Sequence, residues 1–165
     1  MRRRGRAIAA LGAVVFALCG CSSESRPLPV VDDIAAAIAA VEAADDTVMF
    51  REVNADTEVV RMFVSSTGGP EVVGYLYAEG TLLGPAPPQS VDPGPVFAGD
   101  AVEFEPESVF GAILDELDDP AIERFVITAA DDGVVRYEVF VRSERGGVLA
   151  VQISGDGGVL GVVPR

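Results

Sequence analysis

The clearest indication of the fold is the alternation of apolar and charged residues in Val134-Val135-Arg136-Tyr137-Glu138-Val139-Phe140-Val141-Arg142. Successive side chains of a β-strand point to opposite faces of its sheet. One face of this stretch carries Val135, Tyr137, Val139 and Val141, and the other carries Arg136, Glu138 and Arg142. Such alternation is typical of an antiparallel sheet with one buried and one solvated face. The stretch therefore predicts a sheet that is covered on one side.

A helix upstream of this strand is the predicted cover. It starts at Glu105-Pro106-Glu107-Ser108, with proline in the first turn, and it ends at Asp118-Asp119-Pro120. Its apolar stripe consists of Val109, Phe110, Ile113, Leu114 and Leu117. A helix with one apolar stripe packs on the apolar face of a sheet. Further strands are predicted at 124–129, 134–142, 148–154 and 159–163.

The first half of the chain has the same order of elements. Ile34, Ile38 and Val41, spaced among alanines, predict a helix with an acidic N-cap at Asp32-Asp33 that ends near residue 45. Strands are predicted at 48–53, 59–65 and 72–78, with a candidate fourth at 81–83.

The two halves align with each other. Val59-Val60-Arg61 matches Val134-Val135-Arg136 at an offset of 75, and Leu82-Leu83-Gly84 matches Val159-Leu160-Gly161 at an offset of 77. We therefore predict an internal duplication, with repeats at 31–84 and 105–165. The alternative is that two unrelated segments rich in valine and glycine look alike. The expected fold class is α+β, with two helix-plus-antiparallel-meander repeats, each helix packed on one face of a sheet.

Residues 85–104 form the predicted connector between the repeats. Prolines are dense from Pro85 to Pro95. Proline has no N–H to donate to a strand ladder and fixes its own φ. This proline-dense stretch is therefore predicted to supply no ladder donors and to be a stiff connector.

The N-terminal segment predicts export. Four arginines within residues 1–6 precede an apolar run at 7–18. This run has the length of a signal peptide and is shorter than the roughly 20 residues that span a membrane. Residues 1–20 are therefore predicted to be a signal peptide.

The end of that segment, Leu18-Cys19-Gly20-Cys21, resembles the lipobox of bacterial lipoproteins. The resemblance implies cleavage before Cys21 and diacylation of Cys21, with 21–30 as a lipidated tether on the outer (extracytoplasmic) face of the cell membrane. Cys19 fits less well because Leu18, before it, is not small. The alternative is an ordinary secretory signal that leaves Cys21 as a free or pairing thiol. Lipidation is the better explanation, because after cleavage Cys21 would have no other cysteine with which to form a disulfide.

Charge and composition exclude several function classes. All 26 acidic residues but only 8 of the 12 arginines follow Cys21, so that part of the chain has a net charge of −18. This charge argues against nucleic acid and against a polybasic membrane patch. The chain has no lysine and no histidine. Arginine as the sole cation, with abundant alanine, glycine and valine, indicates a high-GC genome such as that of an actinobacterium.

Catalytic groups are scarce. Without histidine there is no Ser-His-Asp triad, no Cys-His pair and no ordinary zinc site, and without lysine there is no Schiff base. The acidic residues Asp115, Glu116, Asp118 and Asp119 are expected to be a solvated helix end, with a calcium contact or acid–base chemistry as alternatives. We therefore expect a protein that is not an enzyme and that has no cofactor or metal.

Three aromatic residues are candidate contacts for a partner. Tyr75 and Tyr77 are two residues apart on one strand, so their rings share a face. They are binding anchors if that face is exposed and core residues if a helix covers it, and the core is the favoured alternative. Phe97, in the connector, is a third candidate, and core packing is again favoured.

Residues 132–139, the hairpin to 148–153 and the turn Gly155-Asp156-Gly157-Gly158 resemble a PepSY-type module. The tandem arrangement over residues 31–163 is similar to the architecture of β-lactamase inhibitor protein. The resemblance implies a module that binds or inhibits other envelope proteins and does no chemistry. The first half departs from it, with Met62 in the position of Tyr137.

Two functions are therefore expected. The first is a non-catalytic, membrane-anchored envelope lipoprotein that binds another envelope protein. The alternative is a carrier of a lipid or glycolipid with an apolar cavity between sheet and helix, which is motivated by the 49% hydrophobic composition.

Overall fold

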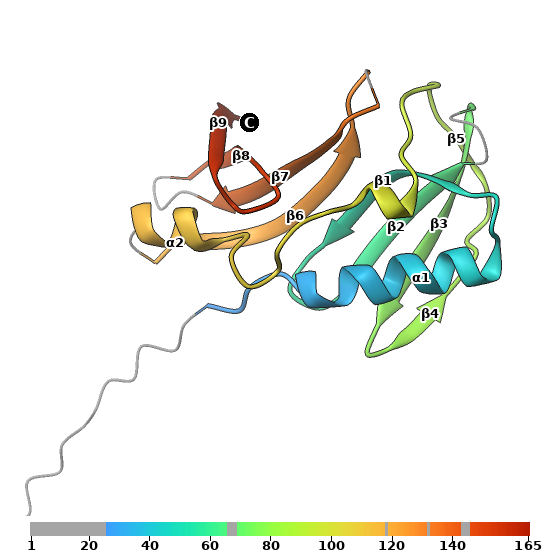
Figure 1. Ribbon diagram of the computed structural model, residues 1–165, viewed down its shortest axis with the longest axis horizontal. Coiled ribbons are helices and arrows are strands. Elements are labelled where there is room, and N and C mark those ends of the chain that lie inside the picture. The colour runs from blue at the N-terminus through green and yellow to red at the C-terminus, as the bar shows by residue number, and fades with distance from the viewer. Residues whose placement is uncertain (1–25, 66–68, 118, 132, 143–145) are drawn as a thin grey trace, which may run out of the picture.

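The computed structural model describes residues 26–65, 69–117, 119–131, 133–142 and 146–165, and Figure 1 shows its ribbon. The helical elements are η1 (Val31–Asp33), α1 (Ile34–Ala44), η2 (Gly99–Ala101) and α2 (Gly111–Glu116). The strands are β1 (Met49–Ala55), β2 (Val60–Ser65), β3 (Glu71–Ala78), β4 (Thr81–Leu83), β5 (Gln89–Ser90), β6 (Ala121–Ala129), β7 (Val135–Arg142), β8 (Val148–Ile153) and β9 (Val159–Pro164). The predicted α+β class is confirmed.

The strands form one continuous sheet. Their order is β4-β3-β2-β1-β6-β7-β8-β9, with β5 beside β3, and every pair is antiparallel. Each of the two four-strand sets follows a helix along the chain. Their first strands, β1 and β6, pair with each other in the middle of the sheet, where Val53 lies opposite Ile127.

The alternation of β7 is the expected one. Tyr137, Val139 and Val141 are buried, while Arg136 and Arg142 are exposed. The buried side chains of both halves join one hydrophobic core. In the second half this core is aromatic: the ring of Phe125 lies 5.1 Å from Phe104, 6.0 Å from Phe110 and 5.9 Å from Tyr137, between centroids.

Helix α1 covers the sheet of the first half (Figure 1) and contacts β2 and β4. Its buried stripe is Ile34, Ala37, Ile38 and Val41, at the predicted spacing. The predicted acidic N-cap is confirmed in position, because Asp33 is the N-cap residue of α1, but its side chain makes no capping hydrogen bond. Asp33 already has helical dihedral angles, with φ −81° and ψ −13°, because the turn η1 precedes the helix. A capping side chain needs an extended backbone at that position.

Helix α2 is much shorter than predicted. It has six residues and starts at Gly111, whereas residues 106–110 form successive turns. A Cβ on Gly157 would collide with the backbone of Ser108, so this segment packs directly on the Gly157 turn and is held out of a regular helix. Only part of the predicted stripe is buried, because Leu114 and Leu117 remain 43% and 39% exposed.

The proline-dense stretch does pair with a strand, which corrects the prediction that it would supply no ladder donors. Gln89 and Ser90 form β5 against the start of β3. Phe97 makes an isolated bridge with Phe50, in which each N–H donates to the other carbonyl at 2.8 Å. These donors belong to the non-proline residues of the connector, so the proline content did not prevent pairing.

Candidate functional site

The predicted signal peptide (1–20), the lipobox with Cys21 and the first residues of the tether lie outside the described residues. Among the described helices, none has the length and apolar character needed to cross a membrane. From Arg26 onward the predicted tether lies on the domain. Arg26 forms an ion pair with Asp119 at 3.1 Å, and the N–H of Val30 donates to the carbonyl of Asp56 at 2.8 Å.

The three aromatic candidates lie on the core side. Tyr75 is opposite Met62 and Tyr77 is opposite Val60 in the β2–β3 ladder. Both partners are fully buried, and the two tyrosines are half-buried at the border of the core. Phe97 is 2% exposed, and its ring stacks on Phe50 at 5.9 Å.

The acidic residues near α2 do not form a site. Asp115 and Glu116 are exposed, and Asp119 pairs with Arg26, while residue 118 lies outside the described residues. Within the described ranges, no three acidic or cysteine side chains are arranged to hold a metal ion.

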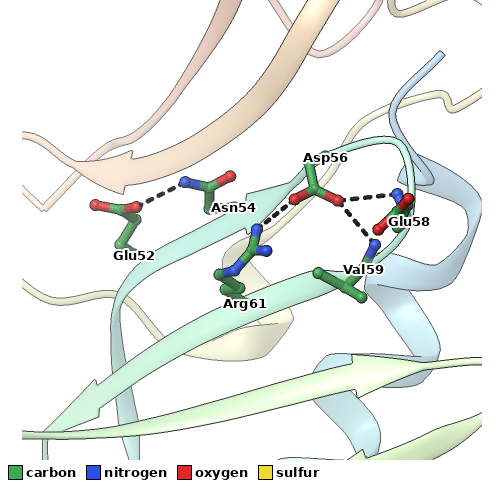
Figure 2. A network of polar contacts seen from close by, with 6 residues as sticks. All are labelled: Glu52, Asn54, Asp56, Glu58, Val59 and Arg61. Carbon is green, nitrogen blue, oxygen red and sulfur yellow. Dashed lines mark hydrogen bonds and ion pairs between the residues drawn. The ribbon is translucent and has the colours of Figure 1, made fainter. Parts of the chain in front are cut away.

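A polar row follows β1 and β2 on the face that is turned away from the core (Figure 2). At its turn, Asp56 accepts hydrogen bonds from the N–H groups of Glu58 and Val59, both at 2.9 Å, and from Nη1 of Arg61 at 2.5 Å. Burial opposes ionisation of Asp56, but these donors outweigh it, so the pKa of Asp56 lies below its usual value. At the other end, Nδ2 of Asn54 donates to Glu52 at 3.2 Å.

Arg51 lies at a β-bulge in β1. Phe50 pairs with Val64 and Glu52 pairs with Phe63, so Arg51 is an extra residue without a partner in β2. Its Nη1 is buried and has no hydrogen-bond partner in the described part of the chain. It lines a surface pocket of about 360 Å³ between the sheet and the connector.

Strand β9 forms one edge of the sheet. Four of its apolar side chains are exposed: Val159 by 46%, Leu160 by 72%, Val162 by 53% and Val163 by 42%. The strand has no charged residue. A free, apolar edge is a template on which another strand can pair.

A groove of about 380 Å³ runs between α1 and residues 99–106. Its apolar lining includes Ile34, Ala35, Ile38, Val102 and Phe104, and Asp32, Glu42 and Asp100 add acidic groups. The groove is open to solvent and lies beside the helix. It is therefore a surface feature and not the enclosed cavity between sheet and helix that a carrier was expected to have.

The bulge at Arg51 and the open edge at β9 were not predicted from the sequence, although a sequence pattern indicates each of them. Phe50 and Val53 are three residues apart and both fully buried, which a regular strand does not allow, and this spacing indicates the bulge at Arg51. Strand 159–163 lacks the alternation of 134–142, which is the signal of an edge that is apolar on both faces.

No family model, curated protein or solved structure matches this chain.

Proposed function

We propose that this chain is a lipid-anchored protein of the bacterial cell envelope that binds another envelope protein and catalyses no reaction. The observation that carries the proposal is β9, an edge strand with four exposed apolar side chains. Extended segments bind such edges by adding a strand to the sheet. The occupant that we propose is an extended segment of a different protein.

Charge favours a different protein over a second copy. The chain has a net charge of −14, and two copies would repel each other as they approach. Strand β9 has no charged side chain, so an apolar partner strand meets no unpaired charge at the contact. Basic residues beside that partner strand would be attracted by the acidic body. We therefore expect an apolar strand with basic flanks.

The lipobox resemblance of residues 18–21 supports the anchor at Cys21. Arg26 is already bound to Asp119 on the domain. Five residues of fully extended chain span about 18 Å at most, so the lipid would hold the domain close to the membrane surface. A short tether suits a partner that is itself at that surface.

The same proposal includes duplication of the two halves. At the aligned positions, Met62 lies opposite Val53, and Tyr137 lies opposite Ile127 in the equivalent ladder. Both first strands also carry a register shift against their second strands. These matches support repeats of the PepSY-like kind, which the resemblance links to binding of envelope proteins.

Val162→Pro tests the role of β9. The N–H of Arg165 donates to Val148 at 2.9 Å. Because antiparallel bonding alternates along a strand, the N–H of Val162 points to the free side. Proline there removes a donor from the free edge and leaves the pairing with β8 intact. Val162→Thr is the matched control, because it keeps the N–H.

The measurement is native mass spectrometry of the full chain, extracted gently from alkali-washed membranes of its host. We expect a complex with a second protein for the wild type and Val162→Thr, and its loss for Val162→Pro. Cys21→Ser should be missing from the washed membranes. A complex that persists in Val162→Pro, or a pair of identical chains in its place, would contradict the proposed edge contact.

A second candidate is the lipid carrier, which would hold an acyl chain in the open groove beside α1 in place of the enclosed cavity that was expected. The volume of the groove, about 380 Å³, is at the lower end of the range for ligand pockets. The same spectra distinguish this candidate, because a carrier would show a stoichiometric mass of lipid beyond the N-terminal modification.

A further inference from the structure

We propose that the pocket at Arg51 binds the carboxylate of a small monocarboxylic acid with a compact apolar body. This site is separate from the edge strand β9 and does not depend on its role. Its guanidinium is positioned by a bulge, covered by the connector and without a partner in the part of the chain that the structure describes.

The bulge directs Arg51 to the outer face. Phe50 and Val53 are both fully buried, so both side chains point to the core. In a regular strand, residues three apart lie on opposite faces. The extra residue at Arg51 removes this conflict and leaves Arg51 and Glu52 both pointing away from the core. Bulges commonly redirect a side chain beside a functional site.

The connector forms the other wall of the pocket. Strand β5 holds it against β3, and the bridge between Phe97 and Phe50 holds it against β1. Between these two points, Gly94 passes over the guanidinium so closely that a Cβ on Gly94 would lie 2.5 Å from Nη2 of Arg51. The guanidinium is therefore held under the connector.

Among the described arginines, Arg51 combines a buried guanidinium nitrogen with the lack of a partner, whereas Arg136, which also forms no ion pair there, is exposed. Arg26, Arg61, Arg142 and Arg165 each form an ion pair, and Arg124 lies over the ring of Phe140 at 4.4 Å. Arg51 forms no ion pair among the described residues, and its Nη1 is buried without a hydrogen bond. A buried charged donor without a partner is unfavourable. An anion with acceptor oxygens removes that cost, and a carboxylate fits the fork of the guanidinium.

The surroundings select the type of anion. Phe63 and Pro95 provide apolar walls, and Gln89 and Thr128 add polar groups. Glu52 lies in the same pocket, and its carboxylate accepts from Asn54. The single guanidinium can balance one negative charge but not the double charge of phosphate, which the carboxylate of Glu52 would repel further. The apolar walls then contact the body of the acid.

The test is calorimetric titration of the full-length chain in detergent with benzoate, with benzamide as the uncharged analogue and with inorganic phosphate. We expect benzoate to bind, and benzamide and phosphate to bind at least about tenfold more weakly. Arg51→Gln should weaken benzoate binding about tenfold to a hundredfold. Arg136→Gln, the same change at an exposed arginine, should leave it unchanged.

Gly94→Ala is a second variant, which keeps the charge of Arg51 and displaces the guanidinium, so it should also weaken benzoate binding. Unfolding in urea separates binding from structure. Without ligand, Arg51→Gln should be at least as stable as Arg136→Gln, because it removes a buried charge that has no partner among the described residues. Lower stability of Arg51→Gln than of Arg136→Gln, equal binding of benzamide, or preference for phosphate would each overturn the proposal.

Discussion

The two edges of the sheet differ in how far their edge strands are covered (Figure 1). At one edge β4 has only three residues, and the outer side of β3 is paired with β4 near its end and with β5 near its start. At the other edge β9 has six residues, four of them apolar and exposed. Short and covered edges are a common protection against unwanted strand pairing. The protein protects one edge in this way and leaves the other open, which is the difference that our proposed function uses.

The covers of the two halves also differ. The first half is covered by the eleven residues of α1, and the second by a six-residue helix together with the rings around Phe125. At the aligned position the first half has Met62 and the second has Tyr137, which bonds to the backbone of Glu103. A long helix covers the core of the first half, and a short helix with an aromatic cluster covers that of the second. We expect substitutions in the two halves to lower the free energy of unfolding by different amounts.

The largest expected effect compares one buried phenylalanine from each half of the sheet. Phe125 and Phe50 are both fully buried, but Phe125 contacts three aromatic rings and Phe50 contacts one. We expect Phe125→Ala to lower the free energy of unfolding by about 3–5 kcal/mol. It should exceed the effect of Phe50→Ala by about 1–3 kcal/mol, because each aromatic pair adds to the burial. Urea unfolding measures both, and equal losses would show that the aromatic cluster has no special weight.

A smaller effect is expected from the hydroxyl group of Tyr137, which belongs to the aromatic cluster of the second half. The hydroxyl of Tyr137 donates to the carbonyl of Glu103 at 2.8 Å and accepts from its N–H at 3.0 Å. Tyr137→Phe should cost about 1–2 kcal/mol, because both backbone groups lose a partner.

The alkaline limb of stability provides the control for Tyr137. Burial raises the pKa of Tyr137 above its usual value of 10.0. Its contribution is therefore complete below pH 10 and is lost as the pH rises through the folded-state pKa. Tyr137→Phe should lack this part of the loss, whereas Met62→Leu should retain it. An identical alkaline decline in all three proteins would contradict the assignment.

The smallest effect compares the first turns of the two meanders. Asp56 binds the β1–β2 turn through two N–H groups and Arg61, whereas the side chain of Asp131, in the β6–β7 turn, makes no hydrogen bond to a described residue. We expect Asp56→Asn to cost about 0.5–1 kcal/mol at pH 7, since the pair with Arg61 is partly solvated. Asp131→Asn should be close to neutral.

Acid should remove the difference between wild type and Asp56→Asn. The pKa of Asp56 is lowered from 3.8, so its contribution is present above that value and is lost as the pH falls through the lower folded-state pKa. Urea unfolding at pH 7 and at about pH 2.5 checks this. A difference that stays constant with pH would mean that the charge of Asp56 has no part in the turn.

Sequence reasoning was most successful where a pattern is local. The spacing of Ile34, Ile38 and Val41 predicted α1, and the alternation around Tyr137 predicted β7, because each pattern reflects the period of its own element. The start of α2 was wrong, because the contact of Ser108 with the Gly157 turn comes from a distant part of the chain. The Arg51 pocket was not predicted, because its walls come from four strands, β1, β2, β3 and β6, and from the connector.

The α+β class, the strongly acidic charge, the lack of histidine and lysine chemistry, and the resemblance of residues 18–21 to a lipobox could all be recognised in the amino-acid sequence. The folded protein was needed to see that β1 and β6 join the halves into one sheet, that β9 is an open edge, and that Arg51 has no partner among the described residues. The physical reason is that periodicity and composition are properties of short segments. The partner of a strand edge or of a buried charge is fixed by residues far away in the chain, which no local pattern contains.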